Sequence, residues 1–400
     1  MYPCFPNEII AHIVSFLDVE TLGRVACASK ELCALARPCL FSRILVSSEK
    51  DLGTLDSEIA RHVRCARIIH HFFPPEKVLK PLLEHATQLC SIHISGADTV
   101  TWDQYSNVSL TFRKSLLAVL SNVEEVVLDG IACLPASVVR KLRKVKRLET
   151  AYFPCFDIDP ADKIGFSSRP APISFAISGW IAAMSNYSDP DDREALRSLD
   201  ILDLSDLKRL YLSLPEPMNS PLIIKILSQC QQTLESLRLH FGGEIVENET
   251  TEAIVYLSQM KSLQEVYIAA TPNCGPLFCF SAVVNAILSS LDTRLENMQL
   301  IVDAEDEADW IDTQMIMRGN NGGPREEWSV LDGKINELLI MQLKLQVVLR
   351  LPESWEHTYA LVHQFVALAM PKSSMNGRFI LEINNPSGIR SLFKLDDLKF

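Results

Sequence analysis

The chain has 400 residues, 48% of them hydrophobic, and a formal net charge of -12. This length exceeds the roughly 250 to 300 residues at which a single core stops growing, so we expect two domains or a small domain leading a repeat array. The excess of carboxylates argues against broad nucleic-acid binding, which depends on Lys and Arg neutralising phosphates.

The cysteines and the apolar segments indicate an intracellular chain. The eleven cysteines are odd in number and form no Cys-x-x-Cys pair, as is typical of reduced thiols. The longest uncharged apolar stretch, residues 172–184, is shorter than the about 20 residues that span a bilayer. The first residues lack the basic segment of a signal peptide. We therefore expect a cytoplasmic or nuclear protein without a membrane partner.

The first helical pattern, over residues 6–18, is unusually apolar. On a helical wheel its apolar stripe has two edges, with Ile9, Ile13 and Phe16 on one and Ile10, Val14 and Leu17 on the other. The stripe spans roughly 160°, whereas a surface helix needs only about 100° to face its own core. A small module cannot hide the excess, so either a partner or the rest of the chain must cover it.

Two more short helices are expected before residue 45. Thr21 and Ser29 are suited to cap their N-termini, because a hydroxyl accepts a hydrogen bond from a free backbone N–H there. Pro38 is expected to stop the third helix.

These helices carry a recognisable pattern of residues. Its members are Phe5-Pro6-Asn7-Glu8-Ile9-Ile10, Ile13, Leu17-Asp18, Leu22, Val25 and Ser29-Lys30-Glu31-Leu32. The pattern resembles the F-box of fungal-type F-box proteins. It departs from the family at Phe5, where leucine is usual, at Ala28, where valine is usual, and at Leu32, where tryptophan is usual.

The resemblance implies an F-box over residues 1–45 that docks on a Skp-family adaptor and, through it, on a cullin. Such docking buries apolar side chains in a groove of the partner. The residues that would contact the adaptor are Phe5, Pro6, Ile9, Ile10, Ile13, Phe16, Leu17, Leu22, Val25 and Leu32. The alternative is that residues 46–400 cover the same face within the chain.

Residues 46–400 show a weak repeat of the form L-x-x-L-x-L, each copy next to a helical pattern. The copies are Val63/Ala66/Ile68, Leu89/Ile92/Ile94, Val123/Val126/Leu128, Leu207/Leu210/Leu212, Leu234/Leu237/Leu239, Leu263/Val266/Ile268 and Leu295/Met298/Leu300. Consecutive copies are about 26 to 34 residues apart, slightly above the usual leucine-rich-repeat period. The segments "LKLQVVLRL" and "FILEI" should close the array.

We therefore predict an α/β fold, with a three-helix F-box followed by an irregular leucine-rich-repeat-like solenoid of strand-helix units. The copies resemble divergent leucine-rich repeats, but the asparagine that usually follows the strand is replaced by His71, Ala97, Pro215, Gly242 and Thr271. Because that asparagine bonds neighbouring turns, an ordinary α/β sheet domain is the alternative. Residues near 150–198 and 303–330 break the period and are interpreted as insertions.

No motif for catalysis, cofactor or metal binding is specific in this sequence. Residues 165–169, "GFSSR", lack the last glycine of a nucleophile elbow. The group His62, Cys65, His70 and His71 matches no zinc spacing. The acidic run 303–309 lacks the glycine of a calcium loop. The basic segment 140–147 is interpreted as an exposed helix face, with an acidic-partner patch or a nuclear signal as alternatives.

The F-box resemblance implies a substrate-recognition adaptor of a Skp/cullin/F-box ubiquitin ligase, without catalysis of its own. A ligase-independent repeat scaffold and a cryptic α/β hydrolase are the alternatives. The target would be a protein bound by the repeat region. Strand alternation puts Tyr211, Arg238 and Tyr267 on the sheet face opposite the leucines. We expect these three residues to form a row that binds this target, because aromatic residues and arginine are enriched at binding hot spots.

Overall fold

The computed structural model describes residues 6–46, 57–70, 82, 84–101, 110–132, 136–150, 169–177, 200–214, 221–241, 259–270, 295–303, 326–341, 344–350, 371–376 and 378–384. The chain divides into two compact units. Unit 1 comprises Met1–Pro172 and Arg193–Asp203, and unit 2 comprises Ile173–Asp192 and Leu204–Phe400.

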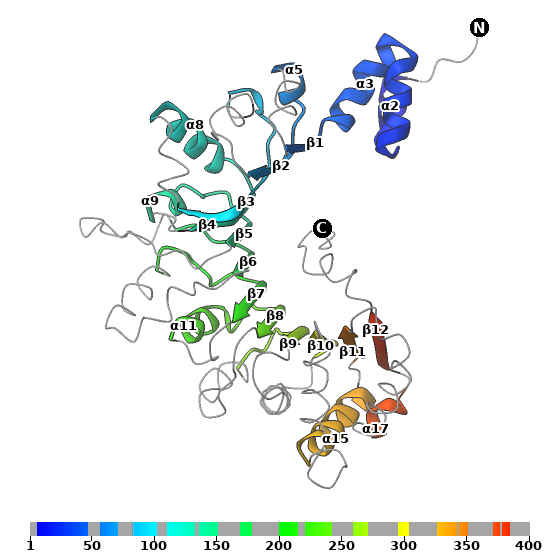
Figure 1. Ribbon diagram of the computed structural model, residues 1–400, viewed down its shortest axis with the longest axis vertical. Helices are drawn as coiled ribbons and strands as arrows, with labels where there is room; N and C mark the ends of the chain where they lie inside the picture. The colour runs from blue at the N-terminus through cyan, green and yellow to red at the C-terminus, as the bar shows by residue number, and fades with distance from the viewer. Residues whose placement is uncertain are drawn as a thin grey trace. The chain divides into compact units, whose positions relative to one another are not determined.

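Unit 1 begins with the three predicted helices, α1 (Asn7–Val14), α2 (Val19–Ala28) and α3 (Lys30–Leu40) (Figure 1). Val14, Leu22 and Ala36, one from each helix, form a buried core with exposures of 2%, 4% and 0%. Partly buried apolar residues pack around this core: Ile10, Leu17, Val25, Ala26, Cys39 and Leu40. The helices therefore form a small module with its own interior.

The helix ends correct two details of the sequence prediction. Asp18, not Thr21, caps α2: its carboxylate accepts hydrogen bonds from the Thr21 N–H at 2.8 Å and hydroxyl at 2.9 Å. These bonds hold the pKa of the Asp18 carboxyl below its usual value. Pro38 does not stop α3, which continues to Leu40, because a proline in the last turn removes only one late intrahelical bond. Ser29 does cap α3, as predicted, and accepts from the Leu32 N–H at 3.1 Å.

The rest of unit 1 is a parallel sheet with strands in chain order. The strands are β1 (Arg43–Val46), β2 (Cys65–His70), β3 (Ser91–Thr101), β4 (Glu125–Ala132) and β5 (Arg147–Thr150). The helices between them are α5 (Ser57–Ala60), α8 (Leu110–Leu120) and α9 (Ala136–Val139). Figure 1 shows α8 and α9 on the same side of the strands. This order of strand and helix is that of a solenoid.

Unit 2 continues the same pattern. Its strands are β6 (Ser174–Ile177), β7 (Arg209–Leu214), β8 (Ser236–Phe241), β9 (Glu265–Ala270), β10 (Asn297–Asp303), β11 (Lys344–Arg350) and β12 (Phe379–Asn384), each parallel to the next. Its helices are α11 (Pro221–Cys230), α15 (Glu326–Met341) and α17 (Pro371–Ser374). The Asp332 carboxylate on α15 is 1% exposed and accepts from the N–H groups of Lys372 and Ser373 on α17, at 3.0 and 2.8 Å.

The leucine-rich-repeat-like prediction is confirmed at the level of strands and their buried faces. In the copy Leu234/Leu237/Leu239 the exposures are 0%, 0% and 2%. The segments predicted to close the array are β11 and β12. Of the described strands, β1, β5 and β6 were not predicted. The strand β6 lies inside the segment 150–198 that was interpreted as an insertion, and it pairs with β7. Residues 304–325, most of the second predicted insertion, lie outside the described residues.

The strand starts are joined by a repeated backbone contact. At eight of the described strand starts, two successive N–H groups donate to a single carbonyl that precedes the neighbouring strand. The N–H groups of Glu235 and Ser236, for example, donate to the Lys208 carbonyl at 2.8 and 2.9 Å. The accepting carbonyls belong to Ser42, Arg64, Cys90 and Glu124 in unit 1 and to Ile173, Lys208, Glu235 and Gln264 in unit 2. This shared acceptor fixes the register of successive repeats.

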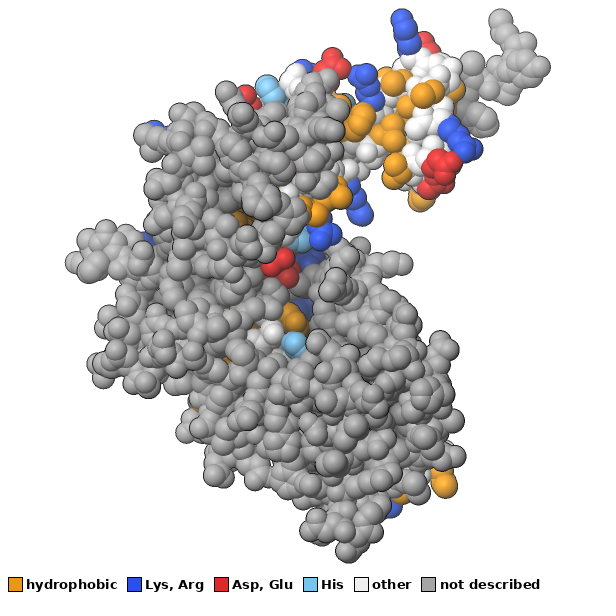
Figure 2. Space-filling view, in the orientation of Figure 1, with side chains coloured by type: hydrophobic (Ala, Val, Ile, Leu, Met, Phe, Trp, Pro, Cys, Tyr) orange, Lys and Arg blue, Asp and Glu red, His pale blue; other side chains and the backbone are white. Residues whose placement is uncertain are grey.

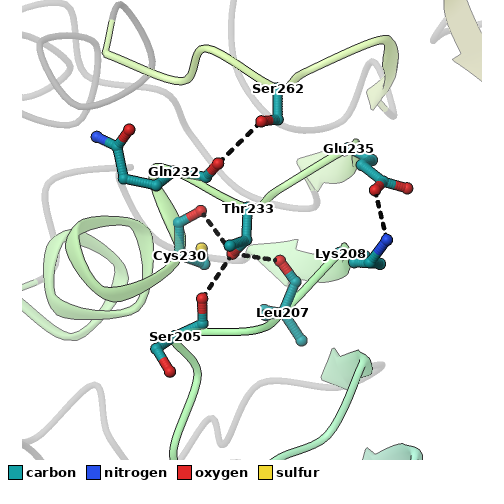
Figure 3. Close-up of polar contacts among 8 residues, drawn as sticks. All are labelled: Ser205, Leu207, Lys208, Cys230, Gln232, Thr233, Glu235 and Ser262. Atoms are coloured by element: carbon teal, nitrogen blue, oxygen red, sulfur yellow. Dashed lines mark hydrogen bonds and ion pairs between the residues drawn. The ribbon is translucent and has the colours of Figure 1, made fainter.

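Side-chain hydroxyls strengthen the same turns in unit 2 (Figure 3). Thr233 Oγ1 lies 2.8 Å from the Ser205 carbonyl and 2.9 Å from the Leu207 carbonyl. Ser262 Oγ donates to the Gln232 carbonyl at 2.8 Å. These bonds link the turns before the strands, so neighbouring turns are bonded without an asparagine after the strand.

We expect Thr233→Val, which keeps the shape and removes the hydroxyl, to destabilise unit 2 by about 1 to 3 kcal/mol, because the partly buried Leu207 carbonyl loses its donor. Urea denaturation of the full chain would measure the change. Ser262→Ala is the matched control with a smaller expected loss, since its bond is exposed. An unchanged midpoint for Thr233→Val would contradict a role in joining the turns.

Candidate interaction surfaces

The first candidate surface is an exposed apolar face on the helical module. Ile9, Ile13 and Phe16 are 46%, 52% and 76% exposed, whereas Ile10 and Leu17 pack against the core of the module. The two edges of the predicted stripe therefore have different roles. One edge holds the module together, and the other is presented at its surface.

This exposed face, defined here as the α1 face, consists of Ile9, Ile13, Phe16 and the neighbouring Val19, which is 73% exposed. The Phe16 ring meets the His12 imidazole edge-on, with centroids 4.9 Å apart. The Phe16 N–H donates to the Ile13 carbonyl at 3.1 Å, which holds the aromatic residue directly after the helix. Figure 2 shows hydrophobic side chains at the surface of this module.

The other residues predicted to contact an adaptor lie elsewhere in the module. Leu22 is 4% exposed and belongs to the core, and Val25 packs against that core. Pro6 is exposed and Leu32 is partly buried. Phe5 lies outside the described residues. The wheel found the apolar residues, but it could not tell the inner edge from the outer one.

The second candidate surface is the predicted row on the unit 2 sheet. Tyr211 stands opposite Arg238, and Arg238 stands opposite Tyr267, in register on three neighbouring strands. The Arg238 guanidinium carbon lies 4.4 Å from the centroid of the Tyr267 ring, within the range of a cation–π contact. All three side chains are partly buried. The structure thus brings these three predicted residues together.

Partial burial keeps the tyrosine of this contact protonated. The pKa of the Tyr267 hydroxyl is raised, mainly by burial and also by the nearby Glu265 carboxylate, while Arg238 opposes the rise. A neutral phenol with a stacked guanidinium is therefore the form present at neutral pH.

A polar pair beside this row was missed in the sequence. Ser213 and His240 are opposite each other on β7 and β8, and the Ser213 Oγ lies 3.2 Å from the His240 Nδ1. Each follows a residue of the row by two positions, so strand alternation puts all four side chains on one face. Extending the same alternation by one step along each strand would have found the pair.

The basic segment 140–147 does not form the predicted helix face. The helix α9 ends at Val139, and the segment forms a turn that leads into β5, with Leu142 and Val145 buried at 0% and 3%. Lys144 donates to Asn122 Oδ1 at 3.1 Å, and Lys146 pairs with Glu124 at 2.9 Å.

Other predicted features fall partly outside the described residues, including residues 165–168 and His71. Among the residues that the structure describes, no cluster of three or more His, Cys, Asp or Glu side chains is arranged to hold a metal ion. Within the same part of the chain, none of the helices combines the length and apolarity needed to cross a membrane.

The described residues comprise a helical module with an exposed apolar face, followed by strand-helix repeats with a polar sheet face. Residues 3–47 match the family model described as F-box-like. The chain thus contains an F-box-like domain, which is followed by a leucine-rich-repeat-like region of parallel strands and helices.

No curated protein matches the chain. A similar solved structure is the leucine-rich repeat-containing protein LegL7 from Legionella pneumophila, with a TM-score of 0.40 and 12% sequence identity, over 86% of this chain and 91% of that one.

Proposed function

We propose that this chain is the substrate-recognition adaptor of a Skp/cullin/F-box ubiquitin ligase. The observation that carries the proposal is the α1 face, with Ile13 and Phe16 52% and 76% exposed on a domain that matches the F-box-like family. F-box domains typically bind Skp-family adaptors. Each large apolar side chain that such an adaptor buries in a groove of its surface contributes about 1.5 to 3 kcal/mol to binding, before the costs of association.

The proposed mechanism is an increase in effective concentration. The F-box-like domain holds the ligase through the adaptor and the cullin, and the repeat region holds a target protein. Ubiquitin transfer between the two then becomes effectively intramolecular. The chain itself supplies binding and orientation, and the catalytic residues belong to other subunits of the ligase.

The proposed target-binding surface is the row of Tyr211, Arg238 and Tyr267. Its support is the register of the three strands and the contact of 4.4 Å between the Arg238 guanidinium carbon and the Tyr267 ring centroid. Tyrosine and arginine are over-represented among the residues that dominate binding energy, and a stacked guanidinium loses less conformational freedom on binding.

Co-expression with a Skp-family adaptor tests the ligase role. The full chain is expected to co-purify with the adaptor and to elute with it as one complex in size-exclusion chromatography. Separate elution of a folded full chain would contradict the proposal and would favour a repeat scaffold that works without the ligase.

A further inference from the structure

Two cysteines of unit 1 lie next to each other at the starts of neighbouring strands. Cys65 is the first residue of β2, and its partner in register on β3 is Ser91. Cys90 directly precedes Ser91, so the two cysteines are separated by one strand spacing and one residue. With about 4.8 Å between strands and about 3.3 Å per residue, their Cα atoms are about 5.8 Å apart. This separation is within the range that a disulfide bridges.

Hydrogen bonds bring the two thiols together. The carbonyl of Arg64, the residue before Cys65, accepts from the N–H groups of Cys90 and Ser91 at 2.8 and 3.0 Å. The Cys90 thiol donates to the same carbonyl at 3.2 Å, and the Cys65 thiol is hydrogen-bonded to that of Cys90. Both cysteines are reduced and partly buried. The two sulfur atoms are therefore in contact across the turn that joins the first repeats.

The surroundings give the two thiols different roles. Burial raises the pKa of the Cys65 thiol to about 11, together with the negative charge of a Cys90 thiolate and the hydrogen bond to Cys90. Of the two charged residues in the same row, Arg43 lowers this pKa and Glu125 raises it. Cys65 therefore keeps its proton, and Cys90 is the member of the pair suited to attack as a thiolate. The bond of Cys90 to the Arg64 carbonyl is exposed, so a small oxidant can reach it.

We propose that Cys90 and Cys65 form a reversible disulfide with a small-molecule disulfide, such as glutathione disulfide, as the oxidant. The Cys90 thiolate attacks one sulfur of glutathione disulfide, whose S–S bond breaks and releases one glutathione thiolate. Cys65 then loses its proton to water, and its sulfur attacks the Cys90 sulfur and releases the second glutathione. The two released thiolates take up the two protons that the cysteines gave up. The chain is oxidised by two electrons, and glutathione disulfide is reduced to two glutathione thiols.

The disulfide would join the first repeats directly after the helical module. The Ser42 carbonyl, which precedes β1, accepts from the N–H groups of Arg64 and Cys65 at 2.8 and 2.9 Å, so backbone bonds already connect the starts of β1, β2 and β3 here. A covalent bond at the same place closes a loop of the chain and restricts the opening of these turns. The inference is independent of the proposed function, because it concerns unit 1 alone and requires neither an adaptor nor a target.

Equilibration of the full chain with glutathione disulfide tests the pair. The reduced chain is incubated with an excess of the oxidant, the remaining thiols are blocked with N-ethylmaleimide, and tryptic peptides are identified by mass spectrometry. We expect a peptide linked through Cys65 and Cys90, and its loss after addition of dithiothreitol. Cys27, which is exposed on α2, should carry glutathione in the same sample and so reports that the oxidant has acted.

Two single variants separate the attacking thiol from the resolving one. In Cys65→Ser the mixed disulfide on Cys90 has no resolving thiol, so glutathione on Cys90 should increase by about tenfold over the unchanged chain. In Cys90→Ser the protonated, half-buried Cys65 should carry about tenfold less glutathione than Cys90 carries in the first variant. Cys27→Ser is the matched control and should keep the link between Cys65 and Cys90.

Two outcomes would overturn the proposal. The first is the absence of a peptide linked through Cys65 and Cys90 in a sample in which Cys27 carries glutathione. The second is equal attachment of glutathione to Cys90 in the Cys65→Ser chain and to Cys65 in the Cys90→Ser chain, which would contradict the assignment of Cys90 as the attacking thiol.

Discussion

Replacing both Ile13 and Phe16 with aspartate is expected to abolish capture of a Skp-family adaptor. The two side chains are 52% and 76% exposed, so the substitution removes apolar surface that the module does not use for its own core. Each lost contact removes about 1.5 to 3 kcal/mol. Together with the cost of burying a carboxylate, the loss corresponds to roughly a thousandfold weaker affinity. Biolayer interferometry with immobilised adaptor would measure it.

A matched control separates loss of the face from loss of the fold. Ala34→Asp introduces the same side chain at an exposed position of α3. It costs about 0.7 kcal/mol of helix propensity, more than either substitution in the test variant, and should still leave capture nearly unchanged. Circular dichroism should show both chains folded. Leu17→Asp is unsuitable as a test because Leu17 packs against the core. Undiminished capture by the Ile13/Phe16 double variant would contradict the assignment of the α1 face.

The sequence predicted the repeats wherever all three apolar positions were aliphatic or methionine. It missed β5 and β6 for a physical reason. In the repeat that contains β5, the third apolar position of the L-x-x-L-x-L pattern is Thr150, which is 2% exposed. In the repeat that contains β6, the first apolar position is Pro172, which is buried. A polar or proline residue can occupy a buried position when the neighbouring strands are in place. A single-sequence pattern contains no information about those neighbours.

The candidate surfaces were predictable to different degrees. Strand alternation was enough to place Arg238 beside Tyr211 and Tyr267, because parallel strands in register need no other information. The division of α1 into inner and outer edges was not predictable, since Ile10 and Ile13 are chemically alike and differ only in what the other two helices cover. The bonds of Thr233 to the Ser205 and Leu207 carbonyls depend on turns brought together only by folding.

The β6 strand leads to the prediction with the largest effect on stability. Phe175 is 1% exposed and is among the largest fully buried side chains. It stands in register with Leu210 of β7, which is in register with Leu237 of β8, so its ring belongs to the apolar row under the sheet. Phe175→Ala is therefore expected to destabilise unit 2 by about 3 to 5 kcal/mol, through lost burial and the cavity that remains.

Differential scanning calorimetry of the full chain would follow this change, because two units can unfold in separate transitions. The transition of unit 2 should move to lower temperature while that of unit 1 stays in place. Ile173→Ala is the control: Ile173 lies two residues before Phe175 and is 40% exposed, so its truncation should cost much less. Equal effects of the two substitutions would show that β6 is not part of the core of unit 2, and that residues 150–198 form a true insertion.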